Sequence, residues 1–138
     1  MPLHGLNHYT LRPQDLEKTK DFYVGVLGLS VGFRPPLDFP GYWLYSAATP
    51  TVHLIGPRAS DADKPERVVG PTGLFDHVAF TASELGEVKA RLQAAKVTFR
   101  ENVLPHIHNT QLFFDDPDGV GVELNFPAHE TPASAIAA

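Results

Sequence analysis

Four side chains that could bind a metal ion lie within short apolar stretches of this sequence. They are His8 in "LNHYTL", His53 in "TVHLI", His77 in "LFDHVAF" and Glu123 in "VGVELNF". Imidazole nitrogens and carboxylate oxygens bind divalent Fe, Mn, Ni, Co and Zn, and two histidines with one carboxylate leave coordination positions open for a substrate. A single histidine in a strand is usually structural, so the spacing of the four residues has to decide.

The spacing follows an internal repeat. His77 lies 69 residues after His8, and Glu123 lies 70 residues after His53. The order of predicted elements also repeats between the two halves. The repeat therefore predicts two pairs of equivalent positions, which two related halves would bring together near their axis.

The elements that position these residues follow from the apolar pattern. Alternating residues predict strands, and apolar residues three or four apart predict helices. In the first half we expect a strand over 6–12, a helix over 15–29 and strands over 29–33, 41–47 and 51–55. In the second half we expect a strand over 75–80, a helix over 83–96 and strands over 97–101, 110–116 and 120–126. Asp15 and Ser83 are the expected N-caps, "DPDG" is a predicted turn, and the tail is expected to fray.

Strand parity places the candidate ligands away from the core. Successive side chains of a strand point to opposite faces. In "VGVELNF" the apolar residues Val, Leu and Phe share one face, whereas Glu123 and Asn125 share the other. By the same parity His8, His53 and His77 lie opposite the apolar residues of their strands. We therefore expect strands that are buried on one side and polar on the other.

Composition limits the function classes. The chain has 138 residues, the size of one domain, with 43% hydrophobic residues, 20% charged residues and a net charge of −5. The acidic balance argues against nucleic acid as a partner. No cysteine is present, which excludes disulfides and thiolate sites and favours a cytoplasmic location. The sequence has neither a secretory signal pattern nor an apolar run long enough for a membrane span.

Four stretches of the sequence carry a resemblance to a known family: "NHYTL", "DFYVGVLGL", "DHVAF" and "FFDDPDGVGVELNF". In these stretches the chain resembles the vicinal oxygen chelate superfamily, which includes glyoxalase I, extradiol dioxygenases and bleomycin-resistance proteins. The resemblance covers roughly residues 4–127. It implies an α+β fold, with two tandem βαβββ modules forming an open, mostly antiparallel cup or half-barrel. The expected single glyoxalase-like domain comprises module one (4–55), a linker (56–73), module two (74–127) and a C-terminal tail (128–138).

The resemblance also implies a cofactor and a binding mode. One divalent metal ion per site (Fe, Mn, Ni, Co or Zn) would be bound by His8, His77 and Glu123, and His53 falls at the position of a fourth ligand. Members of the superfamily hold a small-molecule substrate through two neighbouring oxygens, and chains with two modules usually form homodimers.

Three functions remain open at this point. In a lyase or isomerase of the glyoxalase type, Glu123 or an unligated His53 would be the catalytic base for a reaction through an enolate. In an Fe(II) extradiol-type dioxygenase, two histidines and Glu123 would hold the iron. The tyrosine of the dioxygenase pattern is missing here, since Phe113 and Phe114 stand near its place. A metal-free small-molecule binding protein of the bleomycin-resistance type is the third possibility.

Residues that could contact the substrate are spread over both halves. Aromatic residues could line a binding cup, basic residues could hold an anion, and "PHIHNTQ" is a loop just before a predicted strand. The candidate substrate contacts are Trp43, Phe113, Asn125, His106 and His108, with Phe39, Tyr42 and Phe114 as further aromatic candidates and Arg12, Arg34 and Arg100 as possible anion contacts.

Overall fold

The computed structural model describes residues 4–59, 72–73 and 75–136, and the chain divides into two compact units. Unit 1 is Met1–Pro71 and unit 2 is Thr72–Ala138. Most of the predicted linker, and Leu74 at the start of module two, lie outside the described residues. Each unit is described by itself below.

The described residues of unit 1 form the helix α1 and a four-stranded sheet. The elements of unit 1 are β1 (Tyr9–Leu11), α1 (Leu16–Gly25), β2 (Ser30–Gly32), β3 (Gly41–Ser46) and β4 (Thr49–Ile55). The strand order is β1-β4-β3-β2, with β1 parallel to β4 and the other neighbours antiparallel. Asp15 is the N-cap of α1, as predicted, because its carboxylate accepts a hydrogen bond from the backbone N–H of Lys18 at 3.0 Å.

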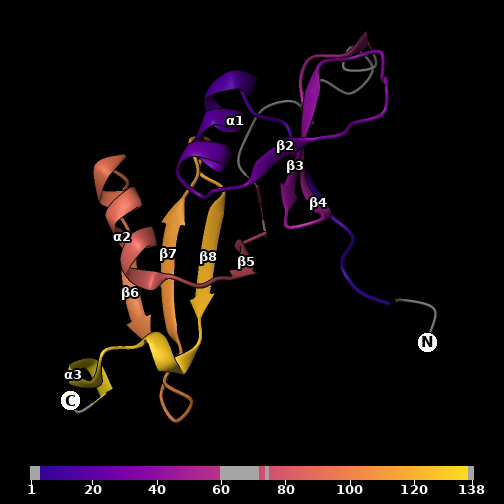
Figure 1. The fold of residues 1–138 in the computed structure, drawn as a ribbon. Coiled ribbons are helices and arrows are strands. Elements are labelled where there is room, and N and C mark those ends of the chain that lie inside the picture. Colours follow the sequence, from indigo (N-terminus) through magenta and orange to yellow (C-terminus); the bar gives the residue numbers. More distant parts are fainter. Residues whose placement is uncertain (1–3, 60–71, 74, 137–138) are drawn as a thin grey trace. The chain divides into compact units, whose positions relative to one another are not determined.

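Unit 2 repeats this topology. Its elements are β5 (His77–Thr81), α2 (Leu85–Ala94), β6 (Arg100–Val103), β7 (Thr110–Asp115), β8 (Gly121–Phe126), a 3₁₀ turn at Ala128–Glu130 and α3 (Ala133–Ile136). The order β5-β8-β7-β6 again has one parallel pair, β5 with β8, and two antiparallel pairs, and Figure 1 shows β6, β7 and β8 side by side. The predicted α+β fold of two βαβββ modules with mostly antiparallel pairing is confirmed.

Strand register shows that the repeat extends to single positions. In each unit the fourth strand lies between the first and third strands, and its central polar residue faces one residue on each neighbour. The equivalent pairs are Thr10–His53 with Ala79–Glu123, and Trp43–His53 with Phe113–Glu123. His53 and Glu123 are therefore equivalent in three dimensions, as the offset of 70 predicts.

The core of unit 2 lies on the face of the sheet opposite Glu123. Val122, Leu124 and Phe126 are at most 6% exposed, and Leu85 and Leu92 of α2 are buried as well. This confirms the predicted apolar face of the last strand. Phe114 is also buried, because it alternates with Phe113 along β7. Phe114 belongs to the core and not to the aromatic residues of a binding cup.

The start of α2 differs from the prediction. Glu84, with a φ of 62°, takes the N-cap position in place of Ser83, and its side chain makes no capping hydrogen bond. Instead the carboxylate of Glu130 accepts hydrogen bonds from the backbone N–H groups of Glu84 at 3.1 Å and Leu85 at 2.7 Å. Thr131 is buried and donates to the carbonyl of His108 at 2.7 Å. The prediction that this part of the tail frays is therefore wrong.

Replacing Glu130 with Ala is expected to destabilise unit 2. The change leaves two N-terminal N–H groups of α2 without their acceptor, and loss of a capping side chain costs about 1–2 kcal/mol. Urea unfolding followed by circular dichroism measures the effect, with His129→Ala, an exposed neighbour, as the control. Equal stability of the two variants would contradict the capping role.

The turn between β7 and β8 is the one expected from "DPDG". The Asp116 carboxylate accepts from the backbone N–H groups of Asp118 at 2.8 Å and Val120 at 3.0 Å, and Gly119 adopts a φ of 84°. This turn fixes where β8 begins, and with it the position of Glu123. Among the described residues, none of the helices is both long and apolar enough to cross a lipid bilayer.

Candidate metal centre

Unit 2 brings His77 and Glu123 together on its two parallel strands. The imidazole Nε2 of His77 lies 3.1 Å from the carboxylate Oε1 of Glu123. Gly121 faces His77 across the pair, and a Cβ at Gly121 would lie 2.5 Å from the carbonyl oxygen of Asp76. The two strands approach this closely because Gly121 has no side chain.

The spacing of these two atoms fits a shared metal ion. Two ligand atoms bound at right angles, each about 2.1 Å from an ion, lie about 3.0 Å apart. The observed 3.1 Å between Nε2 and Oε1 matches this value. The pair therefore fits two adjacent positions around one divalent ion, and the donor set of imidazole and carboxylate suits Fe, Mn, Ni, Co or Zn.

The carboxylate of Glu123 is held in a fixed orientation. The residue is 7% exposed, and its second oxygen, Oε2, accepts hydrogen bonds from Gln111 Nε2 at 3.1 Å and Asn125 Nδ2 at 3.4 Å. Both donors are uncharged amides, so they satisfy the buried oxygen without neutralising the carboxylate. Oε1 is thus the oxygen that faces His77 Nε2 and is available to a cation.

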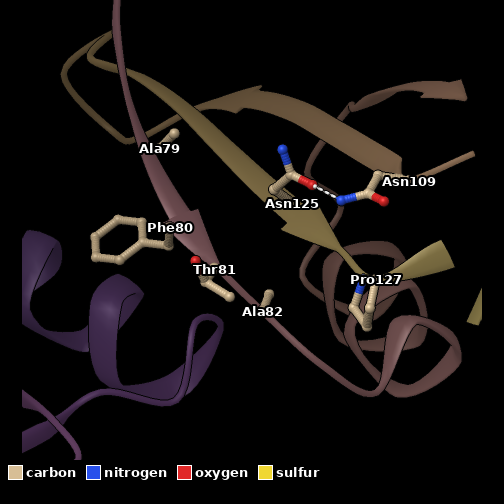
Figure 2. Close-up of a pocket in the computed structure, with 7 residues that line it drawn as sticks. All are labelled: Ala79, Phe80, Thr81, Ala82, Asn109, Asn125 and Pro127. Atoms are coloured by element: carbon tan, nitrogen blue, oxygen red, sulfur yellow. Dashed lines mark hydrogen bonds between the residues drawn. The ribbon is translucent and has the colours of Figure 1, made fainter. Parts of the chain in front are cut away.

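The amide network continues beyond Glu123. Asn102 Nδ2 donates to Gln111 Oε1 at 3.0 Å, and Asn109 Nδ2 donates to Asn125 Oδ1 at 3.0 Å. Figure 2 shows the side chains of Asn125 and Asn109 pointing toward one another beside a pocket of about 460 Å³. The pocket is lined by Ala79, Phe80, Thr81, Ala82, Asn109, Asn125 and Pro127. These lining residues are apolar, amide or hydroxyl, and they carry no ionisable side chain.

In unit 1 three rings form a stack. The ring centroids of His8 and His53 are 3.7 Å apart with an angle of 11° between planes, and those of Trp43 and His53 are 4.1 Å apart at 12°. His53 is therefore enclosed between two rings and is 8% exposed. Strand parity predicts that His8 and His53 lie opposite the apolar residues of their strands, and the stack places the Trp43 ring beside them.

Hydrogen bonds define which nitrogen of each ring carries a proton. His53 Nε2 lies 3.1 Å from the carbonyl oxygen of Pro50, and His8 Nδ1 lies 2.6 Å from Asn7 Oδ1. Because these oxygens only accept, the adjacent nitrogens must donate. The lone pairs of the neutral rings are therefore on His53 Nδ1 and His8 Nε2.

The stack limits what His53 can do as a ligand. An imidazole lone pair lies in the plane of its ring, and the planes of His8 and His53 are nearly parallel. Two such lone pairs do not converge on one ion unless a ring turns. In the observed orientation His53 supports His8 and keeps an unprotonated Nδ1 of its own.

The pKa values of His77 and His53, one histidine from each unit, shift in opposite directions. The pKa of His77 is raised above 6.5, mainly because Asp76 Oδ1 accepts a hydrogen bond from Nδ1 at 2.7 Å, with a further contribution from the charge of Glu123. The pKa of His53 is lowered below 6.5, mainly by burial and also by repulsion from His8 and Arg34. His53 is therefore neutral near pH 7.

We expect NMR to resolve this difference in metal-free protein. The ring of His77 should titrate above pH 6.5 and that of His53 below it, because carboxylates stabilise the charged form of one and burial disfavours the charged form of the other. Asp76→Asn should lower the pKa of His77 and leave that of His53 unchanged. A ring of His77 that titrates below that of His53 would contradict the assignment.

Some of the other predicted substrate contacts lie next to His77 and Glu123, and others do not. Phe113 lies on the same face as Glu123 and makes an edge contact with the His77 ring at 6.0 Å, and the Arg100 guanidinium lies 4.3 Å above the Phe113 ring. His106 is an exposed loop residue, and the hydrogen bond described above for His108 uses only its backbone carbonyl. From this loop it is Asn109 that reaches the network around Glu123.

Two first-half candidates have other contacts. Arg34 donates to the carbonyl oxygen of Phe39 at 3.0 Å, and its guanidinium lies 5.0 Å from the ring of the same residue. The Tyr42 hydroxyl donates to the Glu17 carboxylate of α1. Tyr42 therefore packs toward the helix, on the face opposite Trp43.

Sequence reasoning missed the polar residues that hold the candidate ligands. Gln111 could have been found by strand parity, since it shares a face with Phe113 two residues later. Asn7 and Asp76 immediately precede His8 and His77, and they are equivalent under the offset of 69.

In the described part of the chain no group of three or more His, Cys, Asp or Glu side chains could hold a metal ion. The full ligand set stays a prediction.

Comparison with known proteins identifies the family. A match to the Glyoxalase family, described as the Glyoxalase/Bleomycin resistance protein/Dioxygenase superfamily, covers residues 5–124. The chain belongs to this superfamily. The resemblance noted from its strand and turn motifs is confirmed.

The chain is similar to two curated proteins whose names describe enzymes. The chain is 30% identical over 131 residues to "Glyoxylase I 4" of Arabidopsis thaliana, covering 89% of this chain and 72% of that protein. It is 30% identical over 129 residues to "Biphenyl-2,3-diol 1,2-dioxygenase 3" of Rhodococcus globerulus, covering 92% of this chain but only 65% of that protein.

A solved structure similar to this chain is that of a mutant of the fosfomycin resistance protein FosX from Listeria monocytogenes, complexed with Mn(II) and 1S,2S-dihydroxypropylphosphonic acid. Its TM-score is 0.69 at 19% identity, covering 91% of this chain and 93% of that one, which supports the fold.

Proposed function

We propose that this protein is a divalent-metal-dependent enzyme that binds a small substrate through two neighbouring oxygens and acts as a lyase or isomerase. The observation that carries the proposal is the His77–Glu123 pair, whose 3.1 Å spacing suits two ligands of one ion. Membership of the superfamily and the 30% identity to a glyoxylase I protein support the same class.

We assign His8, His77 and Glu123 as the metal ligands. His8 offers Nε2, because its Nδ1 donates to Asn7, and Glu123 offers Oε1, because its Oε2 accepts from Gln111 and Asn125. When bound, a divalent metal ion would polarise a substrate carbonyl and stabilise the enolate that forms next to it.

We assign the proton transfer to His53. A general base must be unprotonated near neutral pH and must not be consumed as a ligand. The pKa of His53 is lowered by burial, and its Nδ1 carries the lone pair. Trp43 and His8 hold the ring on both sides, so the base is preorganised by the stack.

The substrate contacts follow from the polar face of unit 2. Asn125 and Asn109 place amide groups at the pocket beside Glu123, Phe113 offers an aromatic surface, and Arg100 offers a positive charge next to it. A small substrate held by a metal ion at His77 and Glu123 would have uncharged hydrogen-bonding groups, the Phe113 ring and Arg100 available as contacts.

A homodimer in the cytoplasm completes the proposal. The β2 edge of the unit 1 sheet presents exposed apolar side chains, since Val31 is 50% and Phe33 is 73% exposed. Exposed apolar edge strands favour pairing with another chain. Light scattering of purified protein distinguishes a dimer from a monomer.

An extradiol-type dioxygenase is the second candidate function. Two histidines and one carboxylate also form the ligand set of Fe(II) oxygenases, and one relative at 30% identity is a biphenyl-diol dioxygenase. Against it, Phe113 occupies the ligand face where the dioxygenase pattern requires a tyrosine nearby.

The test measures metal content and reaction in the same samples. Untagged wild-type protein, His77→Ala, His53→Gln and the exposed-loop control His106→Ala are analysed by elemental mass spectrometry. They are then incubated in D₂O with α-hydroxycarbonyl compounds and acyl-CoA esters. An anaerobic Fe(II) sample receives catechol and then oxygen.

Three patterns separate the functions. The lyase or isomerase is supported if wild type and His106→Ala each bind about one metal ion per chain and His77→Ala binds none. It also requires that His53→Gln keeps the metal but no longer exchanges the carbon-bound proton of the substrate. Loss of metal in His53→Gln would make His53 a fourth ligand. A yellow ring-cleavage product would support the dioxygenase, and folded protein that binds aromatic ligands but no metal would leave a binding protein.

A further inference from the structure

The residue before each candidate histidine ligand holds that ligand by the same contact in both units. In unit 1, Asn7 Oδ1 lies 2.6 Å from His8 Nδ1. In unit 2, Asp76 Oδ1 lies 2.7 Å from His77 Nδ1. Both contacts engage Nδ1 and leave Nε2 as the nitrogen that each ring can offer to a metal ion.

The two contacts differ in charge. Asn7 offers a neutral amide oxygen, whereas Asp76 offers a carboxylate. A carboxylate that accepts from a ligating imidazole fixes the ring orientation and raises the basicity of the opposite nitrogen. A neutral amide gives the orientation but less of the charge transfer, since charge-assisted hydrogen bonds are about twice as strong as neutral ones.

The surroundings increase this difference. In unit 2 the ring of His77 lies between two carboxylates, those of Asp76 and Glu123. In unit 1 the ring of His8 lies between a neutral amide and the neutral His53, and the positive charge of Arg34 is near enough to His53 to disfavour its charged form. A cation at His77 would therefore meet two carboxylates, whereas the described contacts of His8 include none.

We propose that Asn7 and Asp76 are outer-shell positioning residues for the two histidine ligands, and that the His77–Glu123 pair, strengthened by Asp76, binds a cation more strongly than His8 does. This inference rests on the proposed function, because it concerns the same ligands. Asn7 and Asp76 join the three proposed ligands as residues of the site, and the metal is bound more strongly by the ligands of unit 2 than by His8.

The test is a reciprocal exchange of the two side chains in the full chain. Asp76→Asn keeps an acceptor oxygen and removes the charge, and Asp76→Ala removes both. Asn7→Asp adds the charge in unit 1, and Asn7→Ala removes the acceptor without a change of charge. Glu87→Gln, at an exposed position of α2, is the control for loss of one negative charge elsewhere.

The readouts are the Co(II) dissociation constant from isothermal titration calorimetry and the visible absorption spectrum of the Co(II) protein. Removing an outer-shell partner weakens metal binding by about 10- to 100-fold. We expect Asp76→Ala to fall within this range and Asp76→Asn near its lower end. Asn7→Ala should weaken binding less than Asp76→Ala, Asn7→Asp should tighten it, and Glu87→Gln should leave it unchanged.

We expect the Co(II) absorption bands to shift in both Asp76 variants and to stay as in wild type in Glu87→Gln. This result would support an effect of Asp76 on the metal that passes through His77. If wild type binds Co(II) but Asp76→Asn and Asn7→Asp share its affinity and spectrum, the inference is overturned while the proposed metal site stands. If Asn7→Ala is silent and only charge changes matter, Asn7 is no positioning residue and the inference fails for unit 1. If wild type binds no Co(II), the proposed function falls, and this inference with it.

Discussion

Glu123→Gln is expected to lower the affinity of the protein for divalent metal ions by more than about 100-fold, since changes to outer-shell partners alone cost 10- to 100-fold. Gln has the shape of Glu and can still accept from Gln111 and Asn125 through its carbonyl oxygen. It lacks the negative charge that the buried carboxylate offers to a cation beside His77. Activity on any substrate of the wild-type enzyme should disappear together with the metal.

Two further variants show whether the loss is due to the ligand or to the fold. Glu101→Gln removes one carboxylate from unit 2 that pairs with Lys89 at 2.6 Å and makes no described contact with His77 or Glu123, so it should bind metal as wild type does. Urea unfolding of Glu123→Gln without metal should resemble wild type, because its hydrogen-bond network is kept. Metal bound with unchanged affinity in Glu123→Gln would rule out Glu123 as a ligand.

Gly121→Ala is expected to damage both the fold and the metal site of unit 2. A Cβ at this position would lie 2.5 Å from the carbonyl oxygen of Asp76 and 3.1 Å from His77 Cβ. The nearest obstacle is backbone, so β5 must move away from β8, at a cost of about 1–3 kcal/mol, as for other overpacked sites. The same movement separates His77 from Glu123 and should weaken metal binding.

Gly86→Ala is the matched control for this substitution. Gly86 lies in α2, and a Cβ there would meet nothing within 4 Å. Alanine in a helix is favoured over glycine by up to about 1 kcal/mol, so stability should stay the same or rise slightly. Chemical denaturation and Co(II) titration of both variants measure the two effects. Wild-type stability and affinity in Gly121→Ala would mean that strand spacing does not control the ligand pair.

The fold was predictable from the sequence because its signals are local or periodic. Alternation in "VGVELNF" separates Glu123 from the buried Leu124, and the structure keeps this separation because a strand has a fixed period of two. Asp15 was predictable as an N-cap for a similar reason, since a capping side chain bonds to N–H groups only two or three residues away. The offsets of 69 and 70 predicted equivalent positions without any contact being known.

Contacts between residues far apart in sequence could not be predicted in this way. Ser83 has the composition of an N-cap, yet Glu130, from a tail without an apolar pattern, binds the first N–H groups of α2. The local propensity was outweighed by a charged acceptor that tertiary structure brings from 46 residues away. "HIHN" attracts interest through its histidines, but Asn109 is the residue whose side chain reaches Asn125.

The sequence alone determined the pair of repeated modules and the polar face of each sheet, and it singled out the four residues that we predict as metal ligands. Tertiary structure decided how each of those residues is held. It stacks His53 between Trp43 and His8, directs Glu123 Oε2 to Gln111 and Asn125, and turns His77 Nδ1 toward Asp76. The physical reason is that residue type and parity fix which face a side chain occupies, whereas ring orientation and the role of each nitrogen or oxygen depend on the neighbouring strands.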